Sequence, residues 1–559
     1  MRWILTAAAL VFAPAMTAAD SQAVAPVTPA VPICGAQASA PPAPAEALLD
    51  GYGTGGFMVR TRSAEAQAYF DNGMQLGHAF AHKASVAAFR KAEQLDPSCA
   101  MCAWGEAWAR GPTLNYPIDD KTQAALAALA DRAAVLAKDG PDKERRLAAA
   151  LRLRYHDGGA RGPGDFAYAR AMDAIARAAP DDNELAILAA DAWMIPTAHR
   201  GGRANLDRAL AFLEPALRRK PDDTGAIHFY IHATELDGVP GRATPYAERL
   251  EQLAPRASHL VHMPSHTFFW VGRYADAARA NLDAVAVDEA NLKRLKLGDD
   301  PFSLTYHGHN VAFGIGAAMM DGDAAAAMAL ARPLLAELPK LKPDPNGAQF
   351  AAGKAYFVEG RYGDQAEVAA LPDPGPAAPY ARAMWRYARG EAAARRGDAR
   401  AVAAEAEKAV LSPADLKALG DASPIAQTLV GVARLTLVGR AAMLDGHPQD
   451  AARAFAKAAS QQEAGLKDYT DPPAWWYPAR RSLAAAQLAM GRAAEAKRQA
   501  RAVLARSPLD PVTLAILARA ERAQGRDADA QRDLAEARRG WRGEAAALGL
   551  EDPARASAG

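Results

Sequence analysis

A repeat of 34 residues is the feature that most constrains the fold. Gly491 begins the string GRAAEA, and Gly525 begins GRDADA 34 residues later. Pro221 and Pro255, each at the end of a predicted pair of helices, have the same spacing. A unit of this length cannot bury its apolar face alone, so neighbouring copies must stack to form a continuous core. The sequence therefore predicts a stack of helix–turn–helix units.

The period and its residue types resemble the tetratricopeptide repeat (TPR). The unit at 66–99 places Tyr69 and Gly73 on its first helix, Phe89 on its second and Pro97 at its end. Glycine allows helices to approach closely, an aromatic ring fills the space between helix pairs, and proline ends the second helix. The resemblance implies an all-α, right-handed helical solenoid of antiparallel helix pairs. Further turns led by glycine are expected at Gly272, Gly322, Gly360, Gly397 and Gly446.

Composition agrees with a helical, globular chain of 559 residues. Half of the residues are hydrophobic and 23% are charged, which is typical of a chain with a buried core. Alanine, the best helix former, is abundant. The 65 basic and 64 acidic residues balance, which argues against a dedicated nucleic-acid binder. Three cysteines are too few for a disulfide-built scaffold.

The N-terminus has the layout of a secretory signal peptide. Arg2 supplies the positive charge, residues 3–16 are apolar, and the small residues 17–19 offer a cleavage site. We therefore expect a signal peptide at 1–19 and a mature protein in the periplasm or outside the cell, without a membrane span. A Pro/Ala-rich leader at 20–60 precedes repeats at 61–200, His-rich central repeats at 201–330, C-terminal repeats at 331–545 and a tail at 546–559.

Seven of the 12 histidines gather in one short region, and their register matters more than their number. They are His228, His232, His259, His262, His266, His307 and His309. His228 and His262 are 34 residues apart, and so are His232 and His266. The same HxxxH pair thus occurs at equivalent positions of two consecutive repeats, and residues i and i+4 share one face of a helix.

In TPR proteins, which this chain resembles, the first helix of each unit lines a concave groove, so these imidazoles are expected to converge there. Three interpretations stay open: a transition-metal site, a metal-free groove for a polar ligand or peptide, and histidines that only satisfy local backbone groups. Seven histidines could furnish two metal sites of three ligands each. Pro264 lies between His262 and His266 and should kink the helix, which re-aims His266 toward the others or away from them.

The CxxC string at Cys99 and Cys102 has no thioredoxin-like context. A local disulfide is the plainest outcome in an oxidising compartment, and a redox or metal role is the alternative. The string DYTDPPAWWYP contains Trp475, Trp476 and Tyr477, which either form a wall for ligand stacking or pack the junction before the last repeats. The usual motifs of zinc proteases, α/β-hydrolases, P-loop enzymes and Rossmann enzymes do not occur.

Several long strings resemble a family of exported bacterial TPR proteins of unassigned function. They include HFYIHATE, HLVHMPSHTFFWVGRYADA, the pair HN and DPPAWWYPAR. The resemblance implies a helical solenoid with a histidine-rich centre, but no settled reaction. Its motifs match at His82, Cys99, His228, His232, Glu235, His259, His262, His266, His309 and Asn310, whereas His307 is an addition in this chain.

These observations favour a transition-metal site centred on two HxxxH pairs. The expected ligands are His228, His232, His262 and His266, with His259, His309 and Glu235 as further ligands or as residues that orient them. The metal would be copper, zinc or iron, serving redox or hydrolytic chemistry, and Glu235 would be the candidate proton acceptor. The alternative is a non-enzymatic scaffold whose groove holds a peptide or a protein partner, with no role in nucleic-acid binding.

Overall fold

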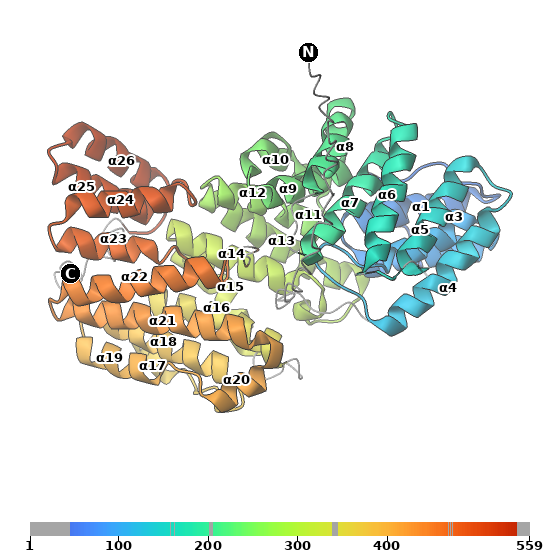
Figure 1. Cartoon of the computed structure of the whole chain (residues 1–559). Helices are drawn as coiled ribbons and strands as arrows, with labels where there is room; N and C mark the ends of the chain where they lie inside the picture. Colours follow the sequence, from blue (N-terminus) through green and yellow to red (C-terminus); the bar gives the residue numbers. More distant parts are fainter. Residues whose placement is uncertain are drawn as a thin grey trace, which may run out of the picture.

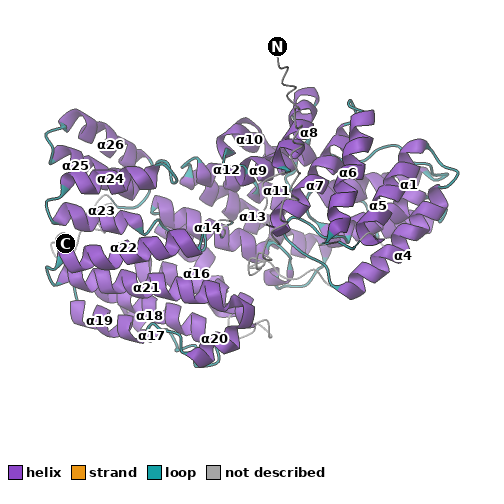
Figure 2. Ribbon diagram, viewed as in Figure 1, coloured by secondary structure: helices purple, strands orange, loops and turns teal. Residues whose placement is uncertain are grey.

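The computed structural model describes residues 45–156, 158–160, 162–200, 205–337, 345–467, 469, 471 and 473–544. These residues form helices joined by turns and contain no β-strand, which confirms the all-α prediction (Figure 2). Within these ranges no helix is long and apolar enough to cross a membrane. The predicted signal peptide, the leader up to residue 44, Cys34 and the C-terminal tail lie outside the described residues.

The helices follow one another along the chain from one end of the molecule to the other (Figure 1). The N-terminal helices are α1 Ala64–His78, α2 His82–Leu95, α3 Ala100–Ala109, α4 Asp120–Ala137, α5 Asp142–His156, α6 Pro163–Ala178, α7 Asn183–Arg200 and α8 Leu206–Arg219. The central helices are α9 Thr224–Leu236, α10 Thr244–Leu253, α11 Ser258–His262, α12 Pro264–Trp270, α13 Tyr274–Leu295 and α14 His307–Asp321.

The remaining helices belong to the C-terminal half of the chain. They are α15 Ala324–Glu337, α16 Pro345–Tyr362, α17 Gln365–Ala370, α18 Pro379–Arg395, α19 Ala399–Lys408, α20 Pro413–Leu419, α21 Ser423–Leu444, α22 Pro448–Gly465, α23 Arg480–Ala489, α24 Ala493–Leu504, α25 Pro511–Arg522 and α26 Asp527–Arg539. Short 3₁₀ turns lie at Pro240–Ala243, Pro301–Ser303 and Gly420–Ala422. Most consecutive helices pack against each other, as expected of a TPR-like helical solenoid.

The first unit shows why small residues alternate with aromatic ones. Phe89 of α2 is fully buried between two glycines of the flanking helices. A Cβ atom on Gly73 of α1 would lie 2.7 Å from the Phe89 ring, and one on Gly105 of α3 would lie 2.3 Å from it. The ring therefore occupies the space that the two glycines leave, as the sequence predicted for this unit.

Replacing Gly105 by alanine is expected to destabilise the N-terminal repeats. The added methyl group would overlap the Phe89 ring inside a packed core, and such overpacking typically costs about 1–3 kcal/mol. Equilibrium urea denaturation measures this loss. Gly316→Ala is the matched control, since Gly316 also lies within a helix but a Cβ there meets nothing within 4 Å. Equal stabilities of the two variants would contradict the packing argument.

The glycine-led turns are confirmed at all predicted positions but one. Gly272, Gly322, Gly397, Gly446, Gly491 and Gly525 have φ between 72° and 83°, a backbone conformation that favours glycine. The expected turn at Gly360 is wrong, because this residue lies inside α16, which continues to Tyr362. Its role is close packing instead, since a Cβ there would lie 2.9 Å from the backbone of Ala388 in α18.

The described end of the predicted leader, residues 45–60, packs along the solenoid. Leu49 exchanges two hydrogen bonds with the Asn72 side chain of α1, at 2.9 and 2.7 Å. The Thr54 amide donates to Thr224 Oγ1 of α9 at 2.8 Å, and Tyr52 is buried. This segment therefore joins α1 to the beginning of the helix that carries the first histidine pair.

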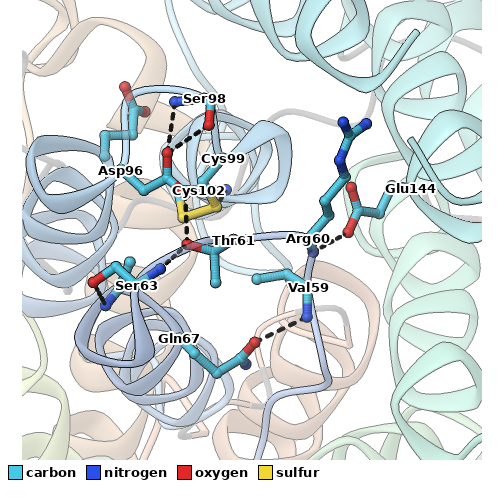
Figure 3. The surroundings of a disulfide bond; sticks show 12 residues. Val59, Arg60, Thr61, Ser63, Gln67, Asp96, Ser98, Cys99, Cys102 and Glu144 are labelled. Atoms are coloured by element: carbon cyan, nitrogen blue, oxygen red, sulfur yellow. Dashed lines mark hydrogen bonds between the residues drawn. A yellow bond between two sulfur atoms is a disulfide. The ribbon is translucent and has the colours of Figure 1, made fainter. Parts of the chain in front are cut away.

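Cys99 and Cys102 form a disulfide at the start of α3 (Figure 3). The bond lies beside Asp96, whose carboxylate accepts hydrogen bonds from Thr61, Arg62 and Ser98. Both cysteine side chains are buried. The structure thus contains the local disulfide that the sequence analysis gave as the plainest outcome for these two cysteines.

The last repeats contact the central ones as well as their own neighbours. The Tyr274 hydroxyl of α13 donates to the carbonyl of Pro508 at 3.2 Å. The Arg542 amide donates to the carbonyl of Asp321 in α14 at 2.8 Å. Glycine at position 322 leaves room for the Trp541 ring, which a Cβ would approach to 2.5 Å. The C-terminal end of the chain thus folds back onto α13 and α14.

Candidate metal centre

Helices α9, α11, α12 and α14 present the histidines. Asp223 caps α9 by accepting a hydrogen bond from the Ala226 amide at 3.3 Å, and every residue from Thr224 to Thr234 is buried. Pro264 ends one helix and begins the next, so α11 and α12 meet at Met263. This break turns His266 toward His262 rather than away from it, and their Nε2 atoms lie 2.9 Å apart.

We call His228, His232 and His259 triad A. One nitrogen atom from each ring lies within 4.8 Å of the other two. The Nε2 atoms of His228 and His259 are 3.2 Å apart. His228 donates its Nδ1 proton to the carbonyl of His78 at 2.6 Å, which leaves the Nε2 lone pair directed at the triad. Among the described residues, His232 Nε2 has no hydrogen-bond partner.

We call His262, His266 and His309 triad B. His262 Nε2 lies 2.9 Å from His266 Nε2 and 3.0 Å from His309 Nε2. The Nδ1 protons of the first two rings are committed elsewhere. His262 donates to Asn281 Oδ1 at 2.6 Å, and His266 donates to Glu235 Oε2 at 2.8 Å. The Asn281 amide is itself fixed by donation to the carbonyl of Ala277.

The short contacts between Nε2 atoms are the most informative feature of triad B. With Nδ1 protonated, a neutral imidazole presents only a lone pair at Nε2. Lone pairs that face each other repel unless a proton or a cation lies between them. Tetrahedral zinc, with Zn–N bonds of about 2.0–2.1 Å, sets ligand nitrogens about 3.3 Å apart, close to the spacing seen here. The donor set and its orientation thus fit a transition-metal ion.

The two triads adjoin each other. The rings of His232 and His266 have centroids 5.5 Å apart, and those of His259 and His262 are 5.6 Å apart. His232, His266 and Glu235 also form a group whose ligand atoms lie within 4.8 Å of one another. Six histidines from two consecutive repeats and α14 therefore form one continuous cluster with two centres. The sequence analysis favoured a site centred on the two HxxxH pairs, with His259 and His309 as further ligands, and also allowed two sites of three ligands each.

Glu235 orients the cluster. One of its oxygens accepts the Nδ1 proton of His266, and the other accepts the Trp270 indole proton at 2.8 Å. Both carboxylate oxygens are therefore already engaged, which favours the orienting role among those that the sequence left open for this residue.

Burial keeps most of the cluster neutral. It lowers the pKa of His228 to about 3 and of His309 to about 4, and holds the pKa values of His232, His259 and His262 well below the ordinary range. His266 is the exception: burial lowers its pKa, but the charges of Glu235 and Asp471 outweigh burial and raise it to about 9. A proton on His266 Nε2 turns its contact with His262 Nε2 into a hydrogen bond, and a bound cation would take the place of that proton.

Aromatic side chains close triad A from one side. Phe80, in the turn between α1 and α2, stacks on His259 with centroids 5.0 Å apart and an interplanar angle of 15°. Its φ of 54° is unusual for a residue other than glycine, and such strain clusters at functional sites. Tyr306 lies beside both rings, 4.3 Å from His259 and 6.0 Å from Phe80 between centroids.

The sequence analysis missed several residues that position this cluster. They are His78, Phe80, Asn281, Tyr306 and Asp471. His78 also pairs with Glu184 through its Nε2 atom, and this charge raises its pKa against the effect of burial. None of these residues belongs to a recognisable spacing pattern; only His78 shares the residue type of the site.

Other candidates from the sequence lie outside the triads. His307 donates from Nδ1 to Asp288 at 3.1 Å, and Asn310 bonds the same carboxylate at 3.2 Å. His82 stacks beside Phe80, with centroids 5.1 Å apart, and burial lowers its pKa to about 4. The disulfide of Cys99 and Cys102 also belongs to neither triad.

The aromatic string after α22 is part of the core. Trp475, Trp476 and Tyr477 are at most 3% exposed. Trp475 packs edge-on against Phe357 of α16 with centroids 5.0 Å apart, and Arg481 lies over the Tyr477 ring at 4.3 Å. Of the two interpretations, packing at a junction agrees with this burial, whereas a stacking wall for a ligand would need exposed rings.

Comparison with known proteins extends to the fold alone. No protein-family model and no curated protein matches the chain. The human IFIT1 dimer with m7Gppp-AAAA is similar over 79% of this chain and 90% of its own, with 13% identity and a TM-score of 0.33. Naa15/Naa10 bound to HypK-THB is similar over 88% of this chain and 91% of its own, with 13% identity and a TM-score of 0.23. The APC/C hetero-tetramer Cut9–Hcn1 is similar over 88% of this chain and 96% of its own, with 12% identity and a TM-score of 0.23.

Helix pairs stacked at a 34-residue period make the chain a TPR-like helical solenoid. What distinguishes it within that architecture is the pair of adjoining histidine triads at its centre.

Proposed function

We propose that this chain is a metalloprotein that binds two transition-metal ions, one in each histidine triad. The observation that carries the proposal is the set of Nε2 atoms in triad B, which face one another at 2.9 and 3.0 Å while two of the rings commit their Nδ1 protons to Asn281 and Glu235. Histidines that merely satisfied local backbone groups would not gather with their Nε2 atoms directed at common points while oxygen acceptors hold their Nδ1 protons.

The donor set narrows the class of metal. Six imidazole nitrogens suit copper, zinc or iron rather than calcium or magnesium, which prefer oxygen ligands. Three protein ligands leave a coordination position open, as in catalytic rather than structural sites. Triad A has this character, and we propose that an ion held there serves redox or hydrolytic chemistry.

We also propose that the protein is exported. The signal-like layout of residues 1–19 and the Cys99–Cys102 disulfide support an oxidising compartment. Copper and zinc are then available without the thiol-rich competition of the cytosol.

Elemental analysis of tag-free protein, purified from the periplasm, tests the metal proposal. We expect about two ions of copper, zinc or iron per chain. A variant with His228, His232, His262 and His266 replaced by alanine should lose them while its circular dichroism stays helical. If neither protein holds metal, even after reconstitution with each of the three, the proposal fails. A partner captured equally well with and without a chelator would then support the scaffold alternative.

A further inference from the structure

One carboxylate from a distant part of the chain reaches triad B. Asp471 lies in the segment between α22 and α23, well away from the central repeats in sequence. Its Oδ1 atom is 3.5 Å from His266 Nε2 and 3.6 Å from His309 Nε2, the same nitrogen atoms that face His262. Asp471 therefore approaches the point on which triad B converges.

The segment that presents Asp471 is held in place by protein contacts. The buried Lys354 of α16 donates from Nζ to the carbonyl of Pro473 at 2.6 Å. The Ala474 amide donates to the carbonyl of Tyr469 at 3.1 Å, and the neighbouring Trp475 is buried. These contacts hold the backbone near Asp471, whose side chain is 39% exposed.

The Asp471 carboxylate would balance part of the positive charge of an ion bound in triad B. A divalent cation held by neutral imidazoles in a buried site carries charge that the low-dielectric surroundings do not solvate. Glu235 already accepts two hydrogen bonds, so Asp471 is the carboxylate with an oxygen atom directed at the lone pairs of triad B. Three imidazoles and one carboxylate would complete a four-coordinate set, whereas His228, His232 and His259 form a group without an acid.

We propose that Asp471 is the fourth ligand of the metal ion in triad B, and that this ion fastens Asp471 and the described residues 473–477 to the central repeats. The inference rests on the proposed metal binding. The two centres would then differ in role. The ion in triad B has four protein ligands and is structural, and the ion in triad A keeps an open coordination position.

Competition titrations of Zn²⁺ against a chelator test the ligand role. Asp471→Asn, which keeps the shape but removes the charge, is expected to weaken one of the two bound ions by about 10–100-fold and to leave the other unchanged. Asp471→His, which restores a ligand atom, should recover most of that affinity. The matched control is Asp445→Asn, which removes the same charge from an exposed acid directly after α21.

Hydrogen exchange tests the fastening. In the unmodified chain Zn²⁺ should slow the exchange of backbone amides around Asp471, and in Asp471→Asn it should not. Two ions bound with unchanged affinity in Asp471→Asn, or equal protection of the segment in both proteins, would overturn the inference and leave the metal proposal standing. A chain that binds no Zn²⁺ at all would overturn both.

Discussion

Zn²⁺ at a hundredfold excess over its dissociation constant is expected to stabilise the folded chain by about 2.7 kcal/mol for each triad that binds it. The triads exist only in the folded state, because each draws its rings from more than one helix. Urea denaturation with Zn²⁺ and with EDTA measures the difference. The total expected for two occupied triads is therefore about 5 kcal/mol.

Single-ring variants assign this stabilisation to each centre. His259→Ala removes one ring from triad A and His309→Ala removes one from triad B, so each should lose about half of the zinc-dependent gain. His447→Ala is the control, since this histidine is exposed before α22 and lies in neither triad. If the zinc-dependent gain persists in both triad variants, or the unmodified chain shows none, the ion does not bind where the histidines converge.

Asp510→Asn is expected to cost about 3–5 kcal/mol of folding stability, because it leaves the guanidinium of Arg481 buried without its counter-charge. Neither side chain of this ion pair is exposed, and Arg481 Nη1 lies 3.3 Å from Asp510 Oδ1. Asparagine keeps the acceptor that caps α25 at the Val512 amide, so the loss reports the charge rather than the cap. Urea denaturation again provides the measurement.

Two comparisons make this test specific. Arg481→Met combined with Asp510→Asn should cost much less than Asp510→Asn alone, since no buried charge then lacks a partner. Asp373→Asn breaks the exposed ion pair with Arg382 and should cost no more than about 1 kcal/mol. Similar losses of folding stability in Asp510→Asn and Asp373→Asn would show that burial does not determine how much the ion pair of Arg481 and Asp510 contributes.

The repeat period predicted much of the centre because it relates positions that are far apart in the chain. Two residues 34 apart occupy equivalent places in neighbouring repeats, so these imidazoles were expected to converge. The rings of His232 and His266 do adjoin each other, whereas His228 lies beside His259. The same reasoning fails at the edges of the site. Asp471 lies in a segment outside the repeat, and Phe80 enters through a turn with positive φ.

Residue type alone also misleads where packing decides the conformation. Gly360 has the composition of a repeat turn but continues α16, because the contact with Ala388 requires a small residue there. The string Trp475–Tyr477 offers the same rings to a ligand or to a core, and only its contacts with Phe357 and Arg481 decide for the core. Such outcomes depend on helices from other repeats, which a local pattern does not contain.

The contacts of Tyr274 with Pro508 and of Asp321 with Arg542 change how the whole array should unfold. In an open array each unit touches only its neighbours, so terminal units fray independently and can be removed with a local penalty. Here the last repeats also contact α13 and α14 of the central repeats. Truncation at the C-terminus would therefore expose surface on α13 and α14, and the far end of the chain becomes part of the cooperative unit that holds the histidine triads.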